Sequence, residues 1–171
     1  ASIASAHFTL EYPKVRGLDE DKLGTFPCGS FDTPSSSRTS WPLTGGQVSL
    51  TMGHIDAIVA VNLAIGSNPG SSFNIPLKAP LSETGYGPFC ITGLSVPSGL
   101  NITDGTLATI QVLTNGDPDG GLYNCADIIF SATAAAPTDC KNGTGVTAVA
   151  ASSNVQPNVT SSGTSPGTSS G

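Results

Sequence analysis

Only two histidines occur in the chain, and His7 is preceded by a short stretch that changes its chemistry. The stretch is Ala4-Ser5-Ala6, a small-residue pattern typical of the site where a signal peptidase cuts. Cleavage after it would make His7 the N-terminal residue. The α-amino nitrogen and the imidazole Nδ1 of His7 could then close a chelate ring on one metal ion, because a strongly bound divalent metal displaces the proton of the amine.

The second histidine, His54, follows Gly53 at the end of a predicted strand. Strand ends gather at the two poles of a β-sandwich, so His7 and His54 could share a pole. One terminal amine and two imidazoles form a three-nitrogen set, which suits Cu(II) because this ion favours tetragonal nitrogen and oxygen ligands. The alternative is that the two histidines are unrelated surface residues, which is the commoner situation in a secreted domain.

A carboxylate could complete such a site, and two aspartates remain open as the third ligand. Asp119 is favoured because it lies in a Gly/Asp turn that should reach a pole; its alternative role is that of an ordinary turn residue before glycine. Asp127 lies further along the following strand, where a buried carboxylate must be either a ligand or a member of a hydrogen-bond network. An extended strand would hold the two aspartates too far apart to share one ion easily.

Alternation of apolar and polar residues predicts short strands, and no segment has a convincing helical period. The first strand should lie at a sheet edge, ended by Pro13, with Phe8, Leu10 and Tyr12 facing the core. We therefore predict an all-β, antiparallel β-sandwich of the immunoglobulin or fibronectin-III kind, with long loops and a disordered C-terminal tail. The last two strands should pair as a hairpin. Strands are expected over 8–12, 47–52, 57–65, 73–77, 89–94, 106–114 and 122–133.

Composition divides the chain into three parts. Residues 1–6 are interpreted as the end of a signal peptide, 7–143 as one domain, and 144–171 as a Ser/Thr/Gly-rich stalk, disordered and O-glycosylated, with no charged residue. The net charge of -6 leaves no basic patch, so nucleic acid is a poor partner. No apolar run has the roughly 20 residues of a membrane span.

The four cysteines indicate an oxidising compartment. None forms a C-x-x-C pair, so a zinc site is disfavoured and two disulfides are expected. Of the three possible connectivities we expect Cys90–Cys125, since both lie in predicted strands, and Cys28–Cys140, since both lie in irregular segments. N-glycosylation sequons occur at Asn101, Asn142 and Asn158. Together with the cleavage pattern, these features favour a secreted or cell-surface protein.

A set of segments in a fixed order resembles one protein family. The segments are His7-Phe8-Thr9-Leu10-Glu11-Tyr12-Pro13, Phe26-Pro27-Cys28-Gly29, Trp41-Pro42-Leu43-Thr44-Gly45-Gly46, His54, and Asp119-Gly120-Gly121-Leu122-Tyr123-Asn124-Cys125-Ala126-Asp127. The chain is similar in these segments to the fungal copper proteins that resemble lytic polysaccharide monooxygenases, the group that includes the Bim-type copper acquisition factors. The resemblance runs from His7 to about Cys140, and a Ser/Thr/Gly-rich tail follows, as in the family.

The resemblance implies an immunoglobulin-like sandwich with a histidine brace for Cu(II). His7 would supply the amine and one ring nitrogen, His54 the other ring nitrogen, and an aspartate takes the place of the axial aromatic residue of the oxidative enzymes. A hard carboxylate ligand should favour Cu(II) over Cu(I) and hinder oxygen chemistry. We therefore expect a monomeric copper-binding protein of copper acquisition or homeostasis, with no catalytic residues. The resemblance also implies a lipid anchor at the cell surface, and a membrane copper transporter is a candidate partner.

Two other functions remain open from the sequence. An active copper-dependent lytic polysaccharide monooxygenase would need exposed aromatic side chains to stack on sugar faces, and Trp41 and Tyr86 lie in predicted loops where they could contribute. A metal-free structural module of the cell wall, or an adhesion module, would also fit the sequons and the tail. That third reading predicts a secreted protein that begins at Ala1, because an uncleaved His7 cannot form the brace.

Overall fold

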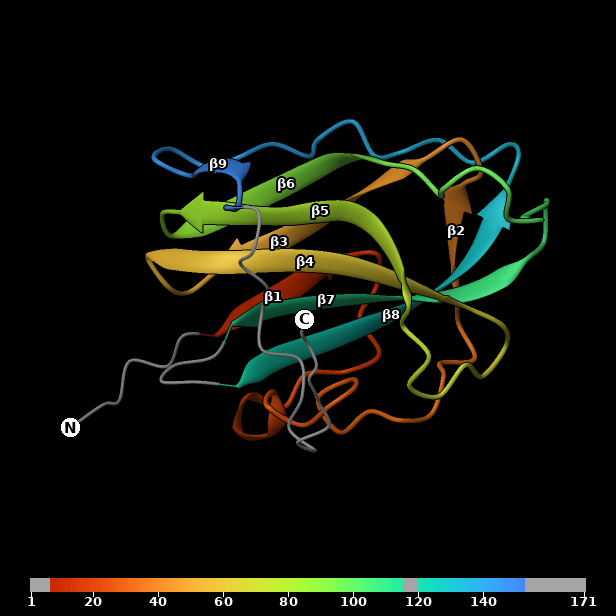
Figure 1. Cartoon of the computed structure of the whole chain (residues 1–171), viewed down its shortest axis with the longest axis horizontal. Helices are drawn as coiled ribbons and strands as arrows, with labels where there is room; N and C mark the ends of the chain where they lie inside the picture. Colours follow the sequence, from red (N-terminus) through yellow and green to blue (C-terminus); the bar gives the residue numbers. More distant parts are fainter. Residues whose placement is uncertain (1–6, 116–119, 153–171) are drawn as a thin grey trace.

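Two β-sheets face each other in a computed structural model that describes residues 7–115 and 120–152 (Figure 1). The smaller sheet contains, in spatial order, β1 (Phe8–Tyr12), β3 (Gly46–Met52) and β6 (Gly87–Leu94). The larger sheet contains, in spatial order, β2 (Thr39–Pro42), β8 (Gly121–Ser131), β7 (Leu107–Asn115), β4 (Asp56–Ile65), β5 (Ile75–Thr84) and β9 (Thr147–Ala150). One short 3-10 helix, η1 (Glu20–Lys22), lies in the loop after β1. The predicted all-β sandwich is confirmed.

Strand pairing is antiparallel throughout, apart from the parallel pair β2–β8. β1 lies at the edge of its sheet, as predicted, and the expected β7–β8 hairpin closes with the pair Asn115–Gly121. The three residues Gly53–Ile55 carry the chain from β3 in the smaller sheet to β4 in the larger one. Across the described parts of the chain, no helix is long and apolar enough to cross a membrane.

The core lies between the sheets and is built from alternate residues of the strands. Phe8 and Leu10 of β1 are buried in it, as their spacing predicts, while Tyr12 is half-buried at its margin after an irregularity in the pairing. Trp41 of β2 is also fully buried, where its ring packs edge-on against Phe130 with the centroids 5.9 Å apart. Trp41 is therefore a core residue and cannot contribute to an exposed platform.

The disulfide prediction is wrong in both pairs. The bonds are Cys28–Cys125 and Cys90–Cys140, with Cα–Cα distances of 5.1 and 5.4 Å. Cys90 and Cys125 do lie in strands, β6 and β8, but in different sheets. Each has core residues on both sides of it along its strand, so each side chain points to the outer face of its own sheet. Two cysteines that face away from each other cannot bond, and each instead fastens an irregular segment to the outside of the sandwich.

The sequence does not predict β2 or β9, and β5 extends well beyond the predicted strand over 73–77. The prolines around β2 predict a loop there, and the small residues of β9 place it in the predicted disordered stalk. β9 pairs with β5 and places residues 147–150 in the folded domain, beyond the predicted domain end at residue 143. β5 carries Pro76 and Pro80, which obscure its pattern; shifts in its pairing with β4 accommodate them because proline cannot donate to a ladder. Most of the predicted stalk, residues 153–171, lies outside the described residues, as do residues 1–6.

Candidate metal centre

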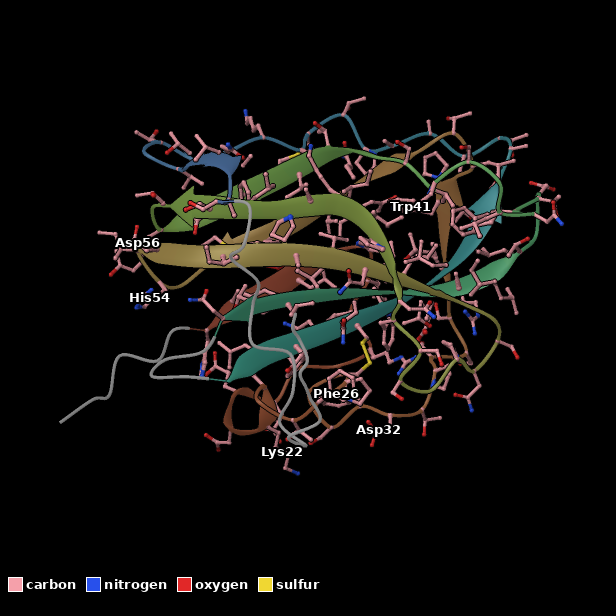
Figure 2. All side chains as sticks on the ribbon, viewed as in Figure 1. Lys22, Phe26, Asp32, Trp41, His54 and Asp56 are labelled. Carbon is pink, nitrogen blue, oxygen red and sulfur yellow. A yellow bond between two sulfur atoms is a disulfide. The ribbon has the colours of Figure 1, made fainter. Side chains whose placement is uncertain are left out.

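His7 directly precedes β1, and His54 lies in the link that leads from β3 to β4, at the same end of the sandwich. The pairing Phe8–Met52 brings the start of β1 to the end of β3, and Gly53 N–H donates a hydrogen bond of 2.9 Å to the carbonyl oxygen of His7. His7 is therefore held opposite the residue before His54. In Figure 1 the starts of β1 and β4 lie at the same end, and Figure 2 labels His54 there. We call this end, with His7, His54, Asn115 and Gly121, the histidine pole.

Gly53 makes the close approach of the two strands possible. A Cβ atom at this position would lie 2.6 Å from the carbonyl oxygen of His7 and 4.0 Å from its backbone nitrogen. The first distance is too short for any real side chain, so His7 and the β3–β4 link could not keep this spacing with another residue at position 53. The backbone nitrogen of His7, which becomes the α-amino group after cleavage, thus lies directly beside the segment that carries His54.

The imidazole of His54 is oriented by the backbone two residues further on. Its Nδ1 lies 2.7 Å from the carbonyl oxygen of Asp56 and 3.4 Å from the backbone nitrogen of the same residue. One ring nitrogen cannot both donate to the oxygen and accept from the nitrogen, and the shorter contact favours donation. The proton then sits on Nδ1 and the lone pair on Nε2. Metal-binding histidines usually donate their second ring nitrogen to such an acceptor, which fixes the ring and raises its basicity.

Asp119, the favoured third ligand, lies outside the described residues, but the base of its turn does not. The side-chain oxygen of Asn115 accepts a hydrogen bond of 2.7 Å from the backbone N–H of Ile58, two residues after Asp56, whose carbonyl oxygen contacts His54. On the other side of the turn, the Asn124 amide of β8 lies 3.4 Å from the carbonyl oxygen of Phe8. Both ends of the turn are therefore fastened to the strands that begin at the histidine pole.

Asp127, the alternative third ligand, lies far along the β7–β8 ladder from the histidine pole, opposite Thr109. Both of its oxygens form an ion pair with Arg16, at 2.9 Å each, and the side chains of the pair are 0% and 4% exposed. Thr109 Oγ1 and the backbone N–H of Ser35 donate two more hydrogen bonds, each of 2.7 Å. Of the two roles that the sequence left open for Asp127, the hydrogen-bond network is the one that these contacts occupy.

The charge of Asp127 is stabilised by this network. Burial raises the pKa of its carboxyl, but the hydrogen bonds from Arg16, Ser35 and Thr109 outweigh burial and hold the pKa below the ordinary value. Arg16 also donates to the carbonyl oxygen of Phe31. The network therefore fixes the long loop after β1 to the outer face of the larger sheet. Sequence reasoning missed Arg16 because it lies in an aperiodic segment, 111 residues from its partner.

Glu83 is the second buried carboxylate of the larger sheet, and sequence reasoning did not single it out. It lies near the histidine pole, because it pairs with Ala57 at the start of β4. It is the last residue but one of β5, paired with Ala57 of β4, and it is 0% exposed. Burial first, and the nearby Asp56 carboxylate second, raise its pKa to about 7, while the charge of His54 acts in the opposite direction. Glu83 and His54 are therefore close enough to influence each other electrostatically, although nothing in the local pattern signals this.

The donor set at the histidine pole fits a copper ion. The backbone of His7 is held beside the link that carries His54, whose ring is oriented by the carbonyl oxygen of Asp56, and His7 would carry an amine after cleavage. No group of three or more His, Cys, Asp and Glu side chains that could hold an ion occurs among the described residues, which exclude Asp119. Two cavities of about 450 and 510 Å³ are lined by neither histidine, and both histidines are half-buried.

Comparison with known proteins points to a family named for copper. The family model described as "Copper acquisition factor BIM1-like" matches residues 5–145. An uncharacterized protein of Aspergillus fumigatus is 46% identical over 88% of the chain and 64% of its own length. The lytic polysaccharide monooxygenase-like protein ham-7 of Neurospora crassa is 34% identical over 76% of the chain and 66% of its own length.

A third relative carries the name of the family. Copper acquisition factor BIM1 of Cryptococcus neoformans is 33% identical over 75% of the chain and 62% of its own length. The chain thus spans less than two thirds of the length of each of these three relatives. The family model, in contrast, covers most of the chain, and it includes both histidines and all four cysteines. The chain belongs to the BIM1-like family of copper acquisition factors.

Proposed function

We propose that the mature protein begins at His7, binds Cu(II) by a histidine brace and serves copper acquisition or homeostasis as a secreted or cell-surface protein. The observation that carries the proposal is the 2.9 Å hydrogen bond from Gly53 N–H to the carbonyl oxygen of His7, because it holds the backbone of His7 beside the residue that precedes His54. Family membership supports copper as the metal. The Ala4-Ser5-Ala6 pattern supports the cleavage, the cysteines and sequons support the location, and the family resemblance supports a lipid anchor.

Each ligand has a defined role in this proposal. His7 supplies its α-amino nitrogen and one ring nitrogen, and His54 supplies Nε2, because its Nδ1 is engaged with the carbonyl oxygen of Asp56. The α-amino group must lose its proton to bind, so Cu(II) affinity should fall at low pH. Asp119 supplies a carboxylate oxygen from the turn between β7 and β8. Copper is the cargo, and we propose a membrane copper transporter as the partner that receives it.

Copper binding without polysaccharide oxidation is supported by the aromatic side chains. Trp41 is fully buried, whereas Tyr86 is 62% exposed in the turn between β5 and β6. Sugar-binding surfaces use several exposed rings, whereas Tyr86 is the one largely exposed ring in the part of the chain that the structure describes, which makes a poor platform. A carboxylate ligand would also favour Cu(II) over Cu(I), which opposes the reduction that oxygen chemistry requires. We therefore propose that the protein is not an oxidative enzyme.

A Cu(II) titration of two forms of the protein tests the brace. The form that begins at His7 should bind Cu(II) more than about a hundredfold more tightly than the form that retains residues 1–6, since removal of an outer-shell partner alone typically weakens binding 10- to 100-fold. His54→Ala in the shorter form should abolish tight binding. Equal affinity of the two forms would show that the amine is not a ligand. N-terminal sequencing of the natural protein checks the cleavage site.

An activity assay separates copper binding from catalysis. The form that begins at His7, supplied with copper, a reductant and either chitin or cellulose, should release no oxidised oligosaccharides. Robust release would favour the monooxygenase reading over ours. Failure of both forms to bind copper would favour the metal-free module.

The substitution Gly53→Ala tests the spacing of the two strands. The added Cβ would meet the carbonyl oxygen of His7 at 2.6 Å and must push the two segments apart. Overpacking of this kind costs about 1–3 kcal/mol, and a comparable loss of metal binding would weaken Cu(II) affinity roughly tenfold. Gly24→Ala is a matched control, because a Cβ there would make only an ordinary contact of 3.7 Å with the carbonyl oxygen of Gly121. Unchanged affinity in Gly53→Ala would contradict the proposed placement of the ligands.

A further inference from the structure

Glu83 is a fully buried carboxylate without a hydrogen-bond donor among the residues that the structure describes. It lies in the middle of three strands, with Ala57 of β4 on one side and Ala148 of β9 on the other. Ala57 belongs to the core between the sheets, and directly paired residues point to the same face, so the Glu83 side chain also points inward. Most buried polar groups have partners, and a carboxylate without any is an exception that requires an explanation.

The position of Glu83 links it to the candidate ligand His54. His54 and Asp56 are the charged groups that act on the Glu83 carboxyl. Two residues after Glu83, Gly85 N–H donates a hydrogen bond of 2.7 Å to the carbonyl oxygen of Ile55, the residue after His54. The end of β5 is thus fastened to the β3–β4 link. A change in the charge of Glu83 should therefore alter the electrostatic potential at His54, and a change in charge at His54 should alter it at Glu83.

Burial of an unpaired carboxylate is unfavourable, and a neutral residue of similar size would avoid this penalty. An ion at the histidine pole would change the balance, because a positive charge near a buried carboxylate stabilises its ionised form. The attraction is strong at such a place, since low-dielectric surroundings screen charges weakly. It is also about twice as large for a divalent ion as for a monovalent one at the same position. The geometry therefore favours a cation of higher charge next to His54.

We propose that Glu83 is a positioning residue of the copper site, which acts on the ion at His54 through its negative charge and favours Cu(II) over Cu(I) without being a ligand. This inference rests on the proposed function. It adds a residue on β5 that acts on the ion without binding it, and β5 supplies none of the proposed ligands. It also gives the buried carboxylate a reason to be present at the histidine pole.

Three variants of the form that begins at His7 test this role. Glu83→Gln removes the charge and keeps the shape, Glu83→Asp keeps the charge, and Glu20→Gln removes an exposed charge from η1 as a control. Affinities for Cu(II) and Cu(I), the Cu(II)/Cu(I) potential and the electron paramagnetic resonance spectrum of bound Cu(II) are measured for each. Glu83→Gln should weaken Cu(II) binding on the order of tenfold relative to Cu(I). A tenfold change in this ratio raises the potential by about 59 mV.

The remaining readouts separate the possible outcomes. The resonance spectrum of Glu83→Gln should show the same nitrogen ligands as the wild type, Glu83→Asp should restore the potential, and Glu20→Gln should not change it. An unchanged potential in Glu83→Gln, in a wild type that binds copper, overturns this inference and leaves the proposed function intact. A changed ligand set would make Glu83 a ligand and also overturn it. A wild type that binds no copper would instead remove the proposed function.

Discussion

Asp127 and Glu83 are both carboxylates of the larger sheet that are shut away from water, yet their surroundings are opposite. Asp127 points outward under the loop after β1 and receives hydrogen bonds from Arg16, Thr109 and Ser35. Glu83 points inward at the histidine pole, and the described residues offer it no donor. The pKa of the first carboxyl is lowered, whereas that of the second is raised to about 7.

The difference distinguishes a carboxylate that stabilises the fold from one that lacks a positively charged partner in the metal-free protein. A buried carboxylate with a full set of donors stabilises the arrangement around it, and here it fixes the long loop to the sheet. A buried carboxylate without donors weakens the fold and is typical of a functional site. The comparison therefore predicts that removal of Arg16, the partner of Asp127, destabilises the protein, whereas neutralisation of Glu83 stabilises the metal-free protein.

The largest effect should follow Arg16→Met, which leaves Asp127 buried without its counter-ion. Loss of one member of a buried ion pair typically costs roughly 3–5 kcal/mol of unfolding free energy. Chemical denaturation of the metal-free protein measures this loss. Lys14→Met is the matched control, because Lys14 lies in the same loop, is exposed and forms no ion pair among the described residues. A loss below about 1 kcal/mol in Arg16→Met would place the network among weak surface pairs and break the comparison.

Glu83→Gln should have an effect of opposite sign that depends on pH. The folded-state pKa of about 7 lies above the ordinary value of 4.5, so the folded protein holds the Glu83 proton more tightly than the unfolded chain does. The stability that protonated Glu83 contributes is therefore fully present below pH 4.5 and is lost as the pH rises through 7. In metal-free protein, the stability of Glu83→Gln relative to the wild type should rise by about 3 kcal/mol between pH 4 and pH 8.

Denaturation curves of the two proteins at several pH values measure this difference. Glu20→Gln is again the control, since Glu20 is exposed. A difference between Glu83→Gln and the wild type that does not change with pH would mean that Glu83 has partners in solution. The two carboxylates would then no longer differ in kind.

The surroundings of Asp127 and Glu83 show which features could be predicted from the sequence and which could not. Alternation predicts β1 and the β7–β8 hairpin, because strand faces repeat every two residues. The pairing of Cys28 with Cys125 could not be predicted, since it depends on which outer face each segment crosses. The burial of Glu83 could not be predicted either, because it depends on β9, whose small residues give no strand pattern. The histidines could be singled out because their rarity and the cleavage pattern are local features.

The smallest expected effect is a decrease in unfolding free energy at acid pH that depends on Asp127; we call this decrease the acid limb. Its folded-state pKa is lowered from the ordinary value of 3.8, so the ionised carboxylate contributes stability that is complete above pH 3.8. This contribution is lost as the pH falls below 3.8 through the folded-state pKa, with a slope of at most about 1.4 kcal/mol per pH unit for one proton. Asp127→Asn lacks the titrating group and should lack the limb, although its stability at neutral pH is lower because Arg16 loses its partner. The readout is therefore the slope of unfolding free energy against pH, in parallel for the wild type and Asp127→Asn. Equal slopes below pH 3.8 would show that Asp127 titrates as it does in the unfolded chain, and that the ion pair with Arg16 does not stabilise its charge.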